Sequence, residues 1–166
     1  MTVARGAGSR YASTMGLFDK WLGKESAPKA SDQAAESPEQ IHMACAALML
    51  EVAEADYVDE PEETQAILKA LEAEFGLTHR TVTDLLERAR KESAGASDMF
   101  PYTHLLNQRL DHEQKCRILT SMWRVAFADG NVDKYEEHLI RRVHELLHLD
   151  HSDFIAAKQA ARATQN

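Results

Sequence analysis

From Glu39 to the end of the chain, apolar side chains recur at the three-to-four-residue period of amphipathic α-helices. The composition agrees, since Ala, Leu and Glu are frequent while the 166 residues include only 7 Gly and 4 Pro. The pattern therefore predicts an all-α fold. About seven helices are expected, near residues 40–55, 61–75, 79–92, 100–109, 112–128, 134–148 and 152–163.

Polar residues at the helix starts support these boundaries. In a capping box, the side chain at the helix start and the one three residues later accept each other's backbone N–H groups. Three pairs have this spacing: Asp59 with Glu62, Asp111 with Gln114 and Asp133 with Glu136. Gly76 follows the helix that ends at Phe75 and is a stop signal.

Part of the helical pattern occurs twice. The segment 52–56, VAEAD, recurs as VAFAD at 125–129. Each copy is followed by a Val-Asp pair, after a one-residue insertion in the second copy, and then by two glutamates. The unit is helix, acidic turn and helix, with repeat one at about 40–92 and repeat two at about 112–163. Two such units can bury their apolar faces against each other about a pseudo-two-fold axis.

Residues 1–38 lack this period, whereas residues 39–166 form the predicted helical domain. The composition of the N-terminal segment is that of a flexible linker, and we expect Met15 to be the natural start. A short amphipathic turn is predicted at residues 16–22. Its apolar face, which could pack on the domain, on a protein partner or peripherally on a membrane, consists of Leu17, Phe18, Trp21 and Leu22.

Charge and cysteine usage narrow the class of protein. The formal net charge is −8, and an acidic protein repels nucleic-acid backbones, so no nucleic-acid partner is expected. No apolar run approaches the roughly 20 residues that span a bilayer. Cys45 and Cys116 lack metal or redox spacing and are predicted to be core residues in a reducing compartment. We therefore expect a cytoplasmic protein.

The acidic turns carry the candidate chemistry. Clustered carboxylates supply the oxygen ligands that hard cations such as Ca²⁺ and Mg²⁺ require, and the ion relieves their mutual repulsion. The candidate metal ligands are Asp56, Asp59, Glu62, Glu63, Asp129, Asp133, Glu136 and Glu137. Helix capping is the alternative role for four of them, namely Asp59, Glu62, Asp133 and Glu136.

Capping does not explain Asp56 and Asp129. An aspartate at the C-terminal end of a helix opposes the helix dipole, so these two are the preferred ligands. The segment 129–133 also begins like an EF-hand loop, but Lys134 stands where the loop needs glycine and Ile140 where it needs a bidentate glutamate. Binding therefore needs carboxylates from elsewhere in the chain and is expected to be weak.

A second pattern, His-Glu-Leu-Leu-His at 144–148, formally matches the zinc-protease motif. The motif needs a third ligand, yet no glutamate follows Glu145 and His151 is too close in sequence to serve. The helical period places His144 and His148 beside the apolar stripe, toward solvent. We interpret the match as chance and expect a protein without enzymatic activity.

The residues around the second turn carry a family resemblance. The stretch 122–130, MWRVAFADG, followed by Val132-Asp133 and by YEEHLIRR at 135–142, resembles TerB-domain proteins of tellurite resistance, over about residues 39–163. The TerB domain is also related to the N-terminal domain of DjlA-type membrane co-chaperones. The resemblance implies a seven-helix fold, a link to tellurite or metal stress and a divalent-cation site of acidic residues. The chain lacks the His-Pro-Asp tripeptide of a J domain, so co-chaperone activity is not expected.

Two functions follow from these observations. The first is a non-enzymatic metal-stress protein that binds Ca²⁺ or Mg²⁺ through both acidic turns, led by Asp56 and Asp129. The alternative is an acidic interaction module that recruits a basic protein partner, anchored through Phe18 and Trp21.

Overall fold

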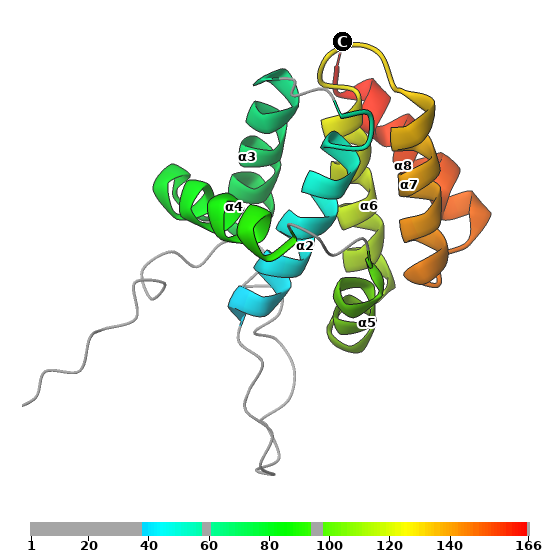
Figure 1. Cartoon of the computed structure of the whole chain (residues 1–166). Coiled ribbons are helices and arrows are strands. Elements are labelled where there is room, and N and C mark those ends of the chain that lie inside the picture. The colour runs from blue at the N-terminus through cyan, green and yellow to red at the C-terminus, as the bar shows by residue number, and fades with distance from the viewer. Residues whose placement is uncertain (1–37, 58–60, 94–97, 166) are drawn as a thin grey trace, which may run out of the picture.

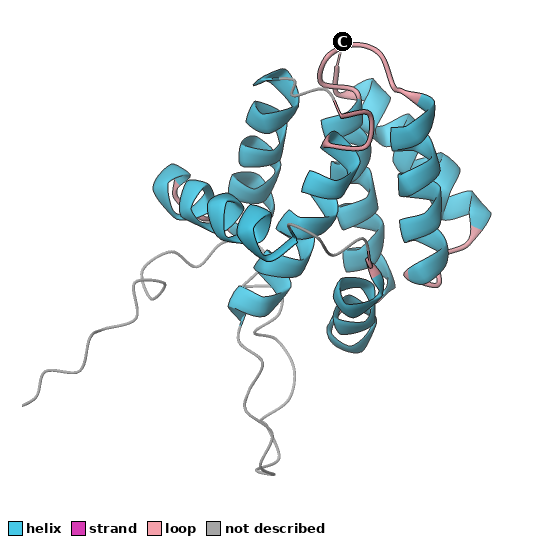
Figure 2. Ribbon diagram, viewed as in Figure 1, coloured by secondary structure: helices cyan, strands magenta, loops and turns pink. Residues whose placement is uncertain are grey.

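The structure, a computed structural model, describes residues 38–57, 61–93 and 98–165. These ranges contain helices and turns but no strand, which confirms the all-α fold (Figure 2). The helices are α2 (Pro38–Ala53), α3 (Pro61–Phe75), α4 (His79–Ser93), α5 (Phe100–Arg109), α6 (His112–Ala126), α7 (Lys134–Leu146) and α8 (His151–Ala163). The turn predicted at 16–22, with Phe18 and Trp21, lies outside the described residues. No helix in the described ranges is long and apolar enough to cross a bilayer.

Helix α2 lies at the centre of the bundle because it is apolar around almost its whole circumference. Every residue from Ile41 to Leu50 is buried, and a helix of this kind must be covered on all sides. α3, α4, α5, α6 and α7 all pack against it. Figure 1 shows α2 and α6 side by side, with α3 and α4 on one side and α7 and α8 on the other.

Helix α8 is held to α6 by an aromatic cluster. The ring of Trp123, which is fully buried, meets the Phe154 ring edge-on at 5.3 Å and the Phe127 ring at 5.6 Å. The ammonium group of Lys158 lies 4.6 Å from the Trp123 ring centre, a cation–π contact that covers the cluster from the solvent side. The acidic turn after α6 is therefore anchored to a rigid element.

Capping fixes several of the helix starts. The capping boxes predicted at Asp111 and Asp133 are both present, while Asp59 lies outside the described residues. A further box, not predicted, joins Asp150 and Asp153 at the start of α8. The predicted helix ends were less accurate, because α6 and α7 stop two residues before 128 and 148.

The described parts of the two acidic turns correspond to each other. α2 ends at Ala53 and α6 at Ala126, while α3 begins at Pro61 and α7 at Lys134, so both pairs of boundaries are 73 residues apart. The same offset relates the backbone hydrogen bond from Tyr57 N to Glu54 O to that from Gly130 N to Phe127 O. The equivalent turns therefore align without the one-residue insertion expected from the sequence. The pseudo-two-fold axis stays a prediction.

Left-handed backbone occurs at the same point of both turns. Tyr57 has φ of 61° and Gly130, its counterpart, has φ of 92°. Glycine adopts this conformation freely, whereas a residue with a Cβ atom is disfavoured there. The backbone of the first turn is therefore strained at Tyr57, whereas the backbone of the second turn is unstrained at Gly130.

Replacing Tyr57 by glycine is expected to raise the free energy of unfolding by up to about 1 kcal/mol. Left-handed backbone costs a non-glycine residue about 1–2 kcal/mol, and the larger unfolded-state entropy of glycine offsets about half of that. Few contacts are lost, because Tyr57 is 97% exposed. Urea denaturation measures the change. The control Tyr57→Ala keeps the Cβ atom, so equal stability of the two variants would contradict this explanation.

Candidate functional site

The two acidic turns lie at the same end of the α2 and α6 pair (Figures 1 and 2). Glu63 is the third residue of α3 and Glu136 the third residue of α7, and the two are related by the same 73-residue offset as the turns. A residue in the first turn of a helix points toward the chain that precedes the helix. The repeated geometry therefore places the side chains of Glu63 and Glu136 in the space between the two acidic turns.

Glu63 and Glu136 form a buried carboxyl pair. Their exposed fractions are 3% and 2%, and the two side chains are within hydrogen-bonding reach of each other. Oε2 of Glu136 accepts the backbone N–H of Asp133 at 2.7 Å, as its capping role requires. Its other oxygen, Oε1, is buried and receives no hydrogen bond from the described part of the chain. One oxygen of the pair is therefore available to a proton or to an ion.

Burial and mutual repulsion shift both pKa values upward. The pKa of Glu63 rises to about 8, first through burial and then through repulsion from Glu136, Asp129 and Asp56. The pKa of Glu136 rises to about 7, again mainly through burial, although the Asp133 N–H and the hydrogen bond with Glu63 act to lower it. The pair therefore binds a proton near neutral pH, where ordinary carboxyl groups are ionised.

Asp56 and Asp129, the preferred ligands of the sequence, lie at the rim of this pair. Asp56 is half-buried and Asp129 exposed, and both are close enough to raise the pKa values of the two glutamates. Since α2 and α6 end at Ala53 and Ala126, both aspartates belong to the turns and not to the helix ends. Asp129 has a structural duty as well, because its Oδ1 accepts the N–H of Asn131 at 2.9 Å. We name these four residues, Glu63, Glu136, Asp56 and Asp129, the acidic cluster.

The other predicted ligands are directed elsewhere. Glu137 forms ion pairs with Lys158 at 2.9 Å and Arg141 at 3.3 Å, which lower its pKa. Glu62 is exposed, and Asp133 serves as the N-cap of α7 through a 2.7 Å bond from Tyr135 N. Asp59 lies outside the described residues. The structure therefore brings together four of the eight candidate carboxylates.

The acidic cluster offers oxygen ligands only, which suits hard cations. In the described residues, no three of its carboxylate oxygens lie within 4.8 Å of one another. The cluster therefore consists of a buried carboxyl pair with a half-buried and an exposed aspartate beside it.

The His-Glu-Leu-Leu-His segment does not present two histidines on one helical face. α7 ends at Leu146, and His148 has φ of 55°, which takes it off the helix. His144 was predicted to face solvent, but it is buried against Phe154, with Nδ1 2.7 Å from Arg141 O. The His144 and Phe154 ring centres are 5.0 Å apart. The motif spacing is present in the sequence, but the two histidines do not share a helical face.

The two cysteines differ from each other. Cys45 is fully buried on α2, as predicted, whereas Cys116 is half-buried on α6. The prediction of a core role for Cys116 was therefore incomplete. The side chain packs partly on the core and also contacts His112, whose Nε2 lies 3.6 Å from Sγ.

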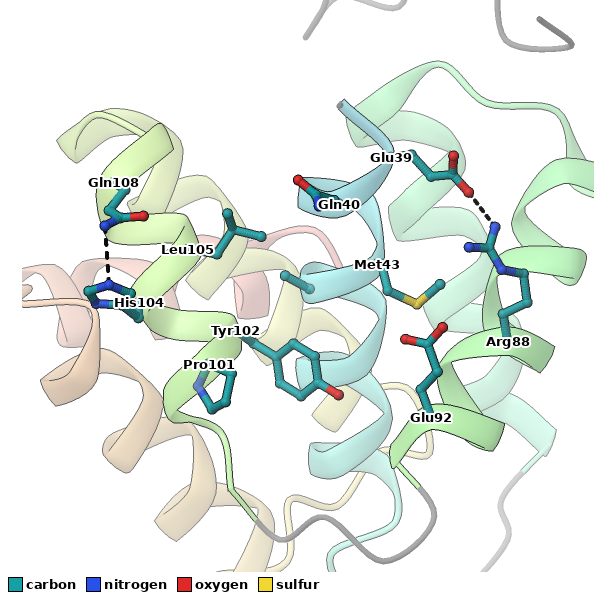
Figure 3. Close-up of a pocket in the computed structure, with 11 residues that line it drawn as sticks. Glu39, Gln40, Met43, Arg88, Glu92, Pro101, Tyr102, His104, Leu105 and Gln108 are labelled. Carbon is teal, nitrogen blue, oxygen red and sulfur yellow. Dashed lines mark hydrogen bonds and ion pairs between the residues drawn. The ribbon is translucent and has the colours of Figure 1, made fainter. Parts of the chain in front are cut away.

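A groove of about 600 Å³ lies between α2, α4 and α5, at the opposite end of α2 from its acidic turn (Figure 3). An ion pair between Glu39 and Arg88 stands at one edge, and a 3.1 Å hydrogen bond between Gln108 and His104 at the other. Its floor is apolar where Met43 contributes. Glu39 and Arg88 neutralise each other, and the lining holds no pair of buried carboxyl groups comparable to Glu63 and Glu136.

Comparison with known proteins agrees with the sequence resemblance. The model of the family described as tellurite resistance protein TerB matches residues 42–159. Among solved structures, the chain is similar to a protein of unknown function from Porphyromonas gingivalis W83, with a TM-score of 0.58 and 18% identity. That match covers 83% of this chain and 99% of the other, and it shows the fold alone. No protein of curated function matches significantly.

The carboxyl pair predicts how stability depends on pH. An acid whose pKa is raised by folding holds a proton that the unfolded chain releases, so stability falls as pH rises from about 5 to about 8. Thermal melting in chelator should show this fall, and Glu136→Gln should reduce it, because an amide needs no proton but still accepts the Asp133 N–H. The exposed Glu62→Gln control should behave as the parent protein. Identical pH profiles for the parent and Glu136→Gln would contradict the assignment.

Proposed function

Since the chain belongs to the TerB family of tellurite resistance proteins, we propose that it is a non-enzymatic metal-stress protein that binds a divalent cation at the acidic cluster. The family supplies the link to tellurite resistance, and the cluster supplies the chemistry. The ion that its oxygen ligands favour is Ca²⁺ or Mg²⁺.

The observation that carries this proposal is the burial of Glu63 and Glu136 against each other at the meeting point of two turns. Repulsion between two carboxylates in close contact amounts to about 4 kcal/mol at the effective dielectric of a protein. Such a pair is stable only if a proton or a cation neutralises it. Oε1 of Glu136, which lacks a hydrogen bond from the described residues, is the atom to which a cation would bind first.

The structure of the rim favours Ca²⁺ over Mg²⁺. Ca²⁺ accepts six to eight oxygens at flexible distances, whereas Mg²⁺ demands a near-ideal octahedron. Two oxygens of the cluster already accept backbone N–H groups, Oε2 of Glu136 and Oδ1 of Asp129. The remaining oxygens come from residues of different burial and mobility, so an irregular coordination shell completed by water is the better match. Binding of this kind is weak.

Ion binding and proton binding compete at the same atoms. A cation that enters the cluster displaces the proton held by the buried pair, so its affinity falls as the pH is lowered. The raised pKa values of the pair, about 8 for Glu63 and about 7 for Glu136, place this competition near neutral pH.

The non-enzymatic character is part of the proposal. It is supported by the segment 144–148, in which His148 lies beyond the end of α7 and His144 is turned into the core. A cytoplasmic location is also proposed, because the thiols of Cys45 and Cys116 are free and reduced thiols are typical of that compartment.

Calcium is expected to stabilise the protein through the buried pair. For a Kd of about 1 mM, 10 mM Ca²⁺ adds about 1.4 kcal/mol to the free energy of unfolding, or about 5 °C in Tm. Calorimetric titration at pH 8 should show a saturable heat, weaker at pH 6. Glu63→Gln and Glu136→Gln should abolish both effects.

The matched control is Glu62→Gln, which removes one exposed carboxylate from the neighbouring position of the same helix. It should retain the heat and the increase in Tm. If the parent protein shows neither effect with Ca²⁺ or Mg²⁺ at millimolar concentration, the proposed cation binding is wrong.

The alternative function, an acidic module that recruits a basic partner, draws on the exposed residues of the same turns. Glu62 and Asp129 are exposed there, as are the aromatic rings of Tyr57 and Tyr135. A partner captured in the presence of chelator and lost with Glu62→Lys would favour this alternative. Capture that depends on Ca²⁺ and survives Glu62→Lys would favour cation binding.

A further inference from the structure

A second group of metal-binding side chains lies at the opposite end of α6 from the acidic cluster. His112 is the first residue of α6, Cys116 lies one helical turn later on the same face, and Asp153 is the third residue of α8. One ligand atom from each residue lies within 4.8 Å of the other two, the only such group among the described residues. The packing of α8 against α6 therefore completes a set that neither helix contains alone.

Two of the three distances between these atoms match those of a tetrahedral metal site, and the third is within 4.8 Å. Sγ of Cys116 is 3.6 Å from Nε2 of His112, and that nitrogen is 3.3 Å from Oδ1 of Asp153. In tetrahedral zinc sites the bonds are about 2.3 Å to sulfur and about 2.0 Å to nitrogen or oxygen, which places neighbouring ligand atoms about 3.3–3.6 Å apart. The three side chains thus need little movement to surround one ion.

The surroundings orient these ligands. The second carboxylate oxygen of Asp153 accepts the N–H of Asp150 at 2.9 Å, which directs Oδ1 toward His112. Lys115, the nearest cation on α6, donates hydrogen bonds to two oxygens elsewhere, at 2.8 and 3.2 Å. The Asp153 side chain is 19% exposed and that of His112 is 64% exposed. The site is therefore walled on the protein side and open to solvent on the other.

We propose that His112, Cys116 and Asp153 bind one Zn²⁺ ion, with a solvent molecule as the fourth ligand. Thiolate and imidazole ligands select zinc and similar transition metals over Ca²⁺ and Mg²⁺, which prefer oxygen. The thiol of Cys116 loses its proton to solvent when the metal–sulfur bond forms, so the thiolate and the Asp153 carboxylate balance the two charges of the ion. This site is independent of the acidic cluster and of the function proposed for it.

Cobalt(II), which takes the same tetrahedral sites, makes this site visible by absorption. Titration of the reduced, metal-free full chain should produce a thiolate-to-cobalt charge-transfer band that saturates at one Co²⁺ per chain. Zn²⁺ should abolish the band by displacement, whereas Ca²⁺ should leave it unchanged. Cys116→Ser should remove the band, and His112→Ala or Asp153→Asn should weaken binding at least tenfold, since even outer-shell substitutions cost 10- to 100-fold.

The matched controls are the other cysteine and a neighbouring histidine. Cys45→Ala and His151→Ala should keep the band, because Cys45 is fully buried on α2 and His151 is not one of the three ligands. Circular dichroism of each variant establishes that it is folded. An alkylation assay tests the parent protein directly, without any variant. Bound Zn²⁺ should slow alkylation of the half-buried Cys116 at least tenfold.

Three results would overturn the proposal. The first is the absence of a thiolate–cobalt band in the full chain, and the second is a band that persists in Cys116→Ser. The third is alkylation of Cys116 at the same rate with and without Zn²⁺. Loss of calcium binding in the acidic-cluster variants would leave the cobalt band intact, so the two sites are tested separately.

Discussion

The burial of α2 from Ile41 to Leu50 is the constraint on which the rest of the structure depends. A helix that is apolar around most of its circumference must be covered, and five other helices pack around it. α6 shares the centre with α2, and the turns that leave these two helices reach the same end of the bundle (Figure 1). The first turns of α3 and α7 then have little space between them. The carboxyl pair of Glu63 and Glu136 is a consequence of this packing, retained although burial disfavours its charge.

The sequence predicted the helices well because their signals are local. The apolar period and the capping boxes at Asp111 and Asp133 depend on residues within one or two turns, and α3 and α5 have the bounds expected. The centre of the site depends on contacts between distant segments. The spacing of Glu136 predicted its role in a capping box. The sequence could not show that the same side chain also contacts Glu63 on another helix.

Part of the acidic cluster could have been predicted from the sequence repeat. An alignment without the insertion places Glu63 opposite Glu136, at the same offset as Asp56 and Asp129, and would have identified the buried pair. The group formed by His112, Cys116 and Asp153 left a weaker signal in the sequence. The four-residue spacing of His112 and Cys116 is visible in the sequence, but Asp153 joins them only through the packing of α8 on α6. Two potential ligands four residues apart on one helix are common. They indicate a metal site only when a third ligand, here Asp153, lies beside them.

The carboxyl pair also couples the binding of a proton or ion to the docking of the two halves of the chain. Glu63 and Glu136 belong to α3 and α7, which lie in different halves of the chain, so the pair exists only while the two halves are docked. Thermodynamic reciprocity then applies, because whatever strengthens docking must raise the affinity of the pair for its proton or ion, and whatever loosens docking must release it. A partner that separated the turns would therefore be sensed as a change in ion occupancy. Conversely, a change in pH near neutrality would alter how firmly the halves hold together.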